Sequence, residues 1–211
     1  MIIAIEGIDG AGKATLTGGV AEELRGRGVD VVKRGFPAYG RTDFADFADD
    51  ALHGRLGDTV DSAWAMALLF ALDRRDLFAS EPVESDSVLL LDRYVASNAA
   101  YSLARTGDPE IVEWIRQTEF GRFALPEPDL TVYLQAPVHL AASRAQSREA
   151  SDDTRTRDAY ERDGGLQQRT ADAYLRLAQE GFGGQWVIVD ADAPAEESVS
   201  RVLQAFDAHV A

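Results

Sequence analysis

The 211-residue sequence has no cysteine, which excludes disulfide bonds, thiolate nucleophiles and cysteine-ligated zinc or iron–sulfur sites. No apolar run approaches the length that spans a membrane, and Met1–Glu6 lacks the basic residues that begin a secretory signal. Positive charge is also scarce, because the chain has 21 Lys and Arg residues and 36 Asp and Glu residues, which gives a net charge of −15. Such an excess of carboxylate argues against unspecific binding to nucleic acid or anionic membrane. We therefore expect a soluble, cytoplasmic protein that binds neither.

The apolar residues that are present are arranged for a parallel sheet. They make up 45% of the chain, and no repeat or Pro/Gly/Ser-rich linker divides it, so we predict one domain over residues 1–211. Short runs rich in Val and Ile, apolar on both faces, alternate with longer helical segments, which is typical of strands covered on both sides. The pattern predicts an α/β three-layer fold with about five parallel strands, at 2–6, 29–33, 88–92, 130–135 and 186–190.

Helices are predicted between these strands, at 12–28, 61–79, 137–146, 158–179 and 196–209, with a further helix after residue 94. The segment 61–79 is apolar almost all round, so it should be buried or lie in an oligomer interface. By contrast, Ser143–Arg157 is polar without apolar periodicity and predicts a mobile loop or lid. Its arginines are either solvated surface charges or groups that stabilise a transferring phosphoryl group: Arg144, Arg148, Arg155 and Arg157.

A phosphate-binding loop lies between the first strand and the first helix. Gly7-Ile-Asp-Gly-Ala-Gly12-Lys13 matches the G-x-x-x-x-G-K pattern of the P-loop. Glycines let backbone N–H groups turn toward phosphate oxygens, the helix N-terminus favours anions, and Lys13 adds a mobile positive charge. The alternative is a glycine-rich turn with an accidental lysine. On the first interpretation the residues that hold ATP are Gly7, Ile8, Asp9, Gly10, Ala11, Gly12, Lys13, Ala14 and Thr15.

One position departs from the P-loop pattern. Ala14 stands where a Ser or Thr normally binds Mg²⁺, and Thr15 is rotated from it by about 100° on the helix. Mg²⁺ must then depend more on phosphates, water and a nearby carboxylate, which this ion accepts readily. Asp9 is the obvious carboxylate, unless it is a turn residue that bonds its own backbone.

Further segments predict a second half of the site, with groups suited to a nucleobase and a phosphate. Phe70 and Arg74 are four residues apart and share a helix face, where a ring beside a planar cation suits a nucleobase; core packing is the alternative for Phe70. Arg93, at the end of the third strand, could hold a phosphate or form a structural pair with Asp92. Asn98 offers an amide that can pair with a pyrimidine imide edge; the alternative is a surface asparagine.

On these motifs the chain resembles the thymidylate kinase family nearly end to end. The resemblance rests on Gly7–Lys13, Phe36–Gly40, Leu69–Arg74, Leu91–Tyr101, Pro128–Leu134 and Arg157–Arg162. It implies a P-loop kinase that phosphorylates dTMP to dTDP with ATP and Mg²⁺, as a homodimer. The alternatives are a kinase for another pyrimidine monophosphate or a deoxynucleoside, and a nucleotide-dependent switch without an acceptor.

The resemblance also implies roles for single residues. Phe70 would stack on thymine, Arg74 and Asn98 would hydrogen-bond its edge, and Tyr101 would crowd the 2′ position of the sugar. The implied dTMP-binding residues are Asp9, Phe36, Pro37, Tyr39, Phe70, Arg74, Arg93, Ser97, Asn98, Tyr101 and Tyr160. The implied catalytic residues are Asp9, Lys13, Arg93, Arg148 and Arg155, and the implied metal ligands are Asp9 and Glu161. Gly10 replaces a P-loop arginine of other members, which Arg148 and Arg155 in the lid would compensate.

Overall fold

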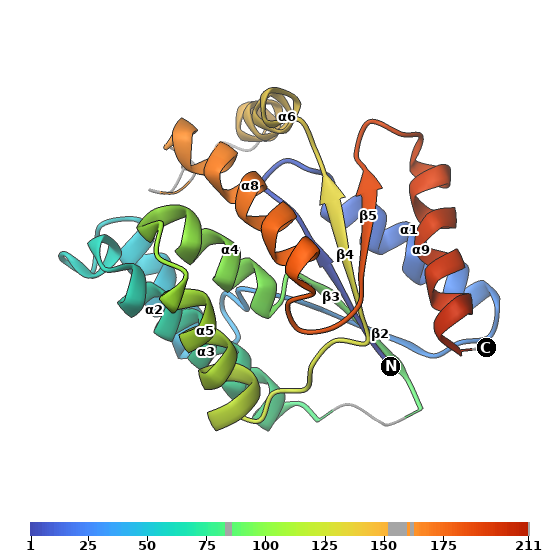
Figure 1. Cartoon of the computed structure of the whole chain (residues 1–211), viewed down its shortest axis with the longest axis horizontal. Coiled ribbons are helices and arrows are strands. Elements are labelled where there is room, and N and C mark those ends of the chain that lie inside the picture. Colours follow the sequence, from blue (N-terminus) through green and yellow to red (C-terminus); the bar gives the residue numbers. More distant parts are fainter. Residues whose placement is uncertain (83–85, 152–159, 161–162, 211) are drawn as a thin grey trace.

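The sheet has five strands, all parallel. A computed structural model describes residues 1–82, 86–151, 160 and 163–210. The strands are β1 (Ile2–Glu6), β2 (Val31–Gly35), β3 (Val88–Asp92), β4 (Leu130–Gln135) and β5 (Trp186–Asp190). They pair in the order β2-β3-β1-β4-β5 (Figure 1). The predicted α/β fold with a five-stranded parallel sheet is therefore confirmed.

Central strands are buried on both faces, as their continuous apolar runs predict. Ile3, Leu90 and Val132 are completely buried. The prediction for β2 was wrong by two residues, because Val29 still belongs to the turn after the first helix, where its N–H donates to the carbonyl of Leu24. As an edge strand β2 also leaves Lys33 exposed, which explains its weaker apolar pattern.

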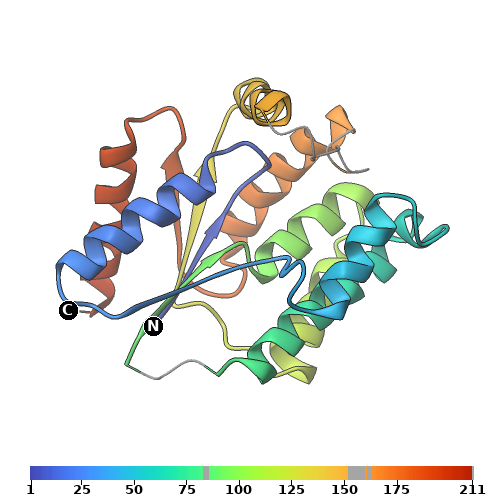
Figure 2. The same cartoon turned by 180° about the vertical axis from the view of Figure 1, so that it is seen from behind.

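Helices cover both faces of the sheet. They are α1 (Lys13–Gly26), α2 (Asp43–Leu52), α3 (Ala63–Ser80), α4 (Val95–Thr106), α5 (Glu110–Arg116), α6 (Val138–Ser151), α8 (Gly164–Glu180) and α9 (Ala195–Val210). A 3₁₀ turn, η1 (Thr59–Asp61), and a π-helical turn, η2 (Gln117–Arg122), join some of them. Helices α1 and α9 lie on one face, and α4 and α8 on the other, with α2, α3 and α5 outside α4 (Figures 1 and 2).

Several helix predictions need correction. No helix was predicted at 43–52 or 110–122, where α2, α5 and η2 lie. Helix α2 is short and acidic, and a tertiary position fixes it: Thr42 caps it by accepting from the N–H of Ala45, while the same hydroxyl donates to Asp73 of α3. The helix predicted over 158–179 is described from Gly164, capped by the side chain of Asp163; residues 158, 159, 161 and 162 lie outside the described residues.

The predicted lid is partly helical. Residues 143–151 are the last turns of α6, so the prediction of a loop was wrong for this part. Ala, Arg, Gln and Glu dominate these turns and have high intrinsic helix propensity, which needs no apolar face. Residues 152–157 lie outside the described residues.

Helix α3 is not fully enclosed by its own chain. Met66, Ala67 and Leu77 are buried, whereas Trp64 and Leu68 are 41% and 40% exposed. The prediction that the helix is buried within its own chain was therefore wrong for the face that carries Trp64 and Leu68. That this face lies in an oligomer interface stays a prediction.

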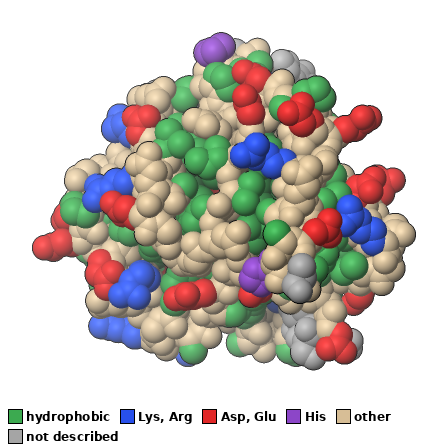
Figure 3. Space-filling model, turned by 45° about the vertical axis from the view of Figure 1, so that its right-hand side comes forward, with side chains coloured by type: hydrophobic (Ala, Val, Ile, Leu, Met, Phe, Trp, Pro, Cys, Tyr) green, Lys and Arg blue, Asp and Glu red, His purple; other side chains and the backbone are tan. Residues whose placement is uncertain are grey.

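The surface carries mixed charge. Figure 3 shows a face on which hydrophobic side chains gather in the middle and acidic and basic side chains are scattered round them. The negative charge of the chain is thus spread, not concentrated in one patch, on this face. In the described part of the chain, no helix combines the length and the apolar character needed to cross a bilayer.

Candidate functional site

The phosphate loop has the tight backbone that its glycines predict. Gly7, Gly10 and Gly12 have φ values of 155°, 81° and 102°, and Gly12 caps α1. A Cβ at Gly10 would lie 2.0 Å from the carbonyl oxygen of Ala141 in α6. No larger side chain fits there in this arrangement, because α6 rests directly on the loop.

Lys13 turns back over the loop. Its side chain is buried, and Nζ donates to the carbonyl of Ile8 at 3.0 Å. Burial and the neighbouring charge of Arg93 lower the pKa of Lys13 to about 8, although Asp9 partly offsets them. Ala14 and Thr15 are both exposed.

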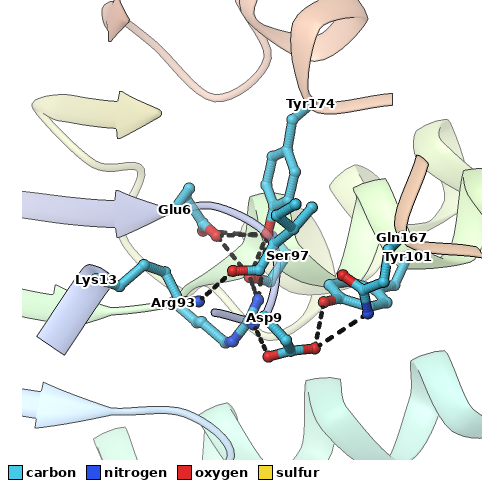
Figure 4. A network of polar contacts seen from close by, with 9 residues as sticks. Glu6, Asp9, Lys13, Arg93, Ser97, Tyr101, Gln167 and Tyr174 are labelled. Carbon is cyan, nitrogen blue, oxygen red and sulfur yellow. Dashed lines mark hydrogen bonds and ion pairs between the residues drawn. The ribbon is translucent and has the colours of Figure 1, made fainter. Parts of the chain in front are cut away.

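The carboxylate of Asp9 accepts hydrogen bonds from three side chains. Its Oδ1 accepts from Nη2 of Arg93 at 2.6 Å, and its Oδ2 accepts from the hydroxyl of Tyr101 at 2.7 Å and from Nε2 of Gln167 at 3.4 Å (Figure 4). Burial raises the pKa of Asp9, but the positive charges of Arg93 and Lys13 outweigh it and hold the pKa well below its usual range. Within the described residues this carboxylate accepts hydrogen bonds from side chains, so the alternative of a turn residue bonded to its own backbone was wrong.

A pocket opens beside Asp9, between α3, α4 and the segment that follows β2. It is lined by all the residues that the resemblance assigned to dTMP: Asp9, Phe36, Pro37, Tyr39, Phe70, Arg74, Arg93, Ser97, Asn98, Tyr101 and Tyr160. Leu52, Met66, Ala67 and Ser102 complete the lining and were not predicted. Segments far apart in the sequence therefore converge on one pocket, with aromatic walls and Arg74, Arg93 and Asp9 as its charged groups.

Glu119, in η2, holds two of the predicted base-reading side chains. Its carboxylate accepts from Nε and Nη2 of Arg74 at 2.6 and 2.7 Å, and from Nδ2 of Asn98 at 2.8 Å. Nδ2 of Asn98 also donates to the carbonyl of Ala67 at 2.9 Å. Arg74 and Glu119 are both buried, so each charge depends on the other. The orientation of both side chains is thus set before any ligand enters.

The rim of the pocket is built by aromatic residues. Tyr39 is 47% exposed, on a segment that Asp73 anchors by accepting from the N–H of Ala38 at 3.1 Å. Tyr101 stacks on Tyr160, with their ring centroids 6.0 Å apart. Arg105 donates to the hydroxyl of Tyr160 at 2.5 Å and lies over its ring.

Comparison with known proteins decides the family. The family model described as thymidylate kinase matches residues 5–202. The chain belongs to the thymidylate kinase family. It is 46% identical over 197 residues to a thymidylate kinase of Mycobacterium tuberculosis, covering 91% of this chain and 92% of the relative. It is 34% identical to a thymidylate kinase of Akkermansia muciniphila, over 97% of this chain and 90% of the relative, and 32% identical to a probable thymidylate kinase of Thermococcus kodakarensis, over 85% and 84%.

The predicted catalytic residues of this family member are only partly described. Asp9, Lys13 and Arg93 lie together at the carboxyl ends of β1 and β3 (Figure 4). The backbone of Arg148 belongs to α6, but its side chain lies outside the described part, as do Arg155 and Glu161 altogether. Arg144 is the member of the arginine set whose side chain is described, and its Nη1 reaches the carbonyl of Ala11 at 3.4 Å.

Four polar residues that contact the predicted site residues were not predicted from the sequence: Glu6, Glu119, Gln167 and Tyr174. Glu6 carried a signal, because it is a charged residue at the end of an apolar strand. Gln167 and Tyr174 are seven residues apart and share one face of α8. The sequence pattern alone does not tell whether that face packs in the core or lines a site. Glu119 gave no signal, since η2 was not predicted. Oε1 of Gln167 is buried and has no hydrogen-bond partner among the described residues.

Proposed function

We propose that the pocket beside Asp9 is where this member of the thymidylate kinase family phosphorylates dTMP to dTDP with ATP as the donor. The observation that carries the proposal is the pocket itself, which gathers Phe70, Arg74 and Asn98 on one side and Asp9 and Arg93 on the other. The P-loop adjoins it at Asp9 and would hold the triphosphate. Two anion-binding regions thus share an edge, as transfer between two phosphates requires.

Thymine would lie against Phe70. Both N–H groups of Asn98 are engaged by Glu119 and by the carbonyl of Ala67, so its carboxamide oxygen is the atom left to accept the N3–H of thymine. Nε and Nη2 of Arg74 donate to Glu119, so Nη1 is the group that would donate to a carbonyl of the thymine ring. This division of donors and acceptors supports a pyrimidine imide as the ligand.

The donor set near the loop fits Mg²⁺. Asp9 supplies one carboxylate whose lowered pKa keeps it ionised, and Mg²⁺ is usually held by one or two carboxylates with phosphate oxygens and water. Asp9 would hold the ion, together with Glu161, which lies outside the described residues. Among the described residues no group of three or more metal-binding side chains occurs, which agrees with an ion bound mainly through nucleotide phosphates. When bound, Mg²⁺ neutralises charge on the phosphates.

Catalysis would come from positioning and charge. A phosphomonoester loses its second proton near pH 6, so the attacking oxygen of dTMP needs no strong general base. Arg93 would hold the acceptor phosphate, and Lys13 would follow the transferring group, with the lid arginines Arg148 and Arg155 adding charge over it. Tyr160, stacked on Tyr101, would close the pocket against water.

We further propose that the chain works as one domain and as a homodimer. Trp64 and Leu68, which are exposed and one helical turn apart on α3, support an interface there, because single chains seldom leave neighbouring large apolar side chains on a helix open to water.

The test of function is ADP release with a panel of acceptors. Purified protein with ATP and Mg²⁺ is given dTMP, dUMP, dCMP, CMP or thymidine, and each kcat/KM is measured. We expect dTMP to lead clearly. A larger kcat/KM for another acceptor would transfer the assignment to that nucleotide, and turnover that no acceptor stimulates would refute a kinase role.

A further inference from the structure

A buried carboxylate lies directly behind Arg93. Glu6 ends β1 with none of its surface exposed. Its Oε1 accepts from the backbone N–H groups of Tyr94 and Ser97 at 2.8 and 3.3 Å, and its Oε2 accepts from the hydroxyl of Ser97 at 2.5 Å. Tyr94 is the N-cap residue of α4, but its own side chain makes no capping hydrogen bond. Glu6 therefore caps α4 from a neighbouring strand and fixes the backbone immediately after Arg93.

Tyr174 joins the same network from α8. Its hydroxyl lies 2.7 Å from Oγ of Ser97 and 3.0 Å from Oε2 of Glu6, and it accepts from Nη1 of Arg93 at 3.4 Å (Figure 4). Nη1 of Arg93 also donates to Oγ of Ser97 at 3.1 Å. Tyr174 is completely buried, so no water competes for its hydroxyl from bulk solvent.

These contacts hold the guanidinium of Arg93 on two sides. Asp9 accepts a hydrogen bond from Nη2, and the hydroxyls of Ser97 and Tyr174 accept from Nη1. Both hydroxyls also donate to Glu6, so they connect Arg93 to it. The backbone of Arg93 is also unusual, with φ of +68°, a conformation that costs a non-glycine residue energy and persists only where its surroundings enforce it. A planar guanidinium anchored at two nitrogens can present its remaining N–H groups in only one direction.

We propose that Tyr174 and Glu6 are positioning residues for Arg93, fixing its guanidinium in the orientation that receives the acceptor phosphate. Neither residue touches the nucleotide; each acts through Arg93. The inference rests on the proposed function, because it takes Arg93 as the phosphate-binding group. On this proposal the buried Tyr174 of α8 strengthens the binding of dTMP, the acceptor, and has no effect on the binding of ATP, the donor.

The chain offers a matched control for Tyr174. Tyr133 in β4 is also completely buried and stacks on Tyr174, with their ring centroids 5.1 Å apart. Its hydroxyl donates to the carbonyl of Ala171 at 3.3 Å, and within the described part of the chain it makes no hydrogen bond to Arg93. Tyr174→Phe and Tyr133→Phe each delete one buried hydroxyl and keep the ring, so both variants should fold.

The experiment compares steady-state kinetics of the two variants. We expect Tyr174→Phe to lower kcat/KM for dTMP by roughly 3- to 10-fold, the size of one net hydrogen bond, with KM for ATP unchanged. Tyr133→Phe should leave both parameters at the wild-type level. Because Tyr174 acts through Arg93, the effect of Tyr174→Phe should shrink below about twofold in an Arg93→Lys background.

Three outcomes would overturn the proposal. They are equal kinetics for the two phenylalanine variants, a loss that raises KM for ATP as much as KM for dTMP, and a Tyr174→Phe effect of full size in the Arg93→Lys background. A lower melting temperature of Tyr174→Phe with wild-type kinetics is a case of the first outcome, because the hydroxyl would then be only structural. If Tyr174→Phe does not fold, Glu6→Gln replaces it in the same comparisons, because Glu6 bonds Tyr174 and does not line the pocket. Wild-type turnover with dTMP tests the proposed function separately, since that measurement does not involve Tyr174.

Discussion

Replacing Glu119 with glutamine should strongly destabilise this protein, although the change is nearly isosteric. Glu119 is completely buried and is the ion-pair partner of Arg74, whose side chain is 3% exposed. The substitution removes the hydrogen-bonded counter-charge of the buried guanidinium of Arg74, and it replaces one acceptor oxygen by an NH₂ group. If the amide oxygen keeps the place of Oε1, which accepts from both Arg74 and Asn98, the NH₂ group faces the N–H of Nε of Arg74. One of the two hydrogen bonds between Arg74 and residue 119 is thereby turned into a repulsive contact between donors.

The magnitude follows from burial. Breaking a buried ion pair by removing one partner costs about 3–5 kcal/mol, because the remaining charge is not solvated. For a chain of this length each kcal/mol lowers the melting temperature by about 2–4 °C, so Glu119→Gln should lose at least about 6 °C. The variant should also raise KM for dTMP, since Arg74 and Asn98 lose the group that orients them.

Urea unfolding followed by circular dichroism, together with dTMP kinetics, measures both effects. Glu113→Gln is the control, because Glu113 pairs with Arg116 at 2.7 Å while both side chains are about half exposed, and its loss should leave stability unchanged. The double variant Arg74→Met/Glu119→Leu should recover much of the stability but not the affinity for dTMP. A Glu119→Gln variant as stable as Glu113→Gln would refute the reasoning.

Two further predictions concern the catalytic edge of the pocket. With a pKa of about 8, Lys13 is mostly protonated at pH 7 and loses its charge as the pH rises, so kcat/KM for ATP, which reports the free enzyme, should fall above about pH 8. In Lys13→Arg this alkaline fall should vanish, and a flat wild-type profile from pH 7 to 9 would contradict the assignment. Tyr101→Ala should relax discrimination between dTMP and its ribose analogue, whereas Tyr101→Phe should keep it while losing a few-fold in turnover with its bond to Asp9; equal discrimination in all three proteins would exclude the steric role.

Local chemistry made much of the fold and the phosphate loop predictable. A strand buried on both faces, such as β3 or β4, needs a continuous apolar run, and such a run is visible in the sequence. The loop at Gly7–Lys13 is equally local in its backbone, since its glycines have positive φ values, although only the fold brings α6 against Gly10. Helices α2 and α5 escaped prediction because they are short and owe their place to contacts with α3 and α4.

The sequence by itself therefore determined the parallel sheet, the P-loop and the types of side chain that the acceptor pocket contains, because these depend on periodicity and on motifs of a few residues. Only the tertiary structure decided how those side chains are held. Glu119 reaches Arg74 across 45 positions, Glu6 reaches Ser97 across 91 and Tyr174 across 168. A buried polar group must find a partner wherever the fold brings one, and no local pattern along the chain records which partner that is.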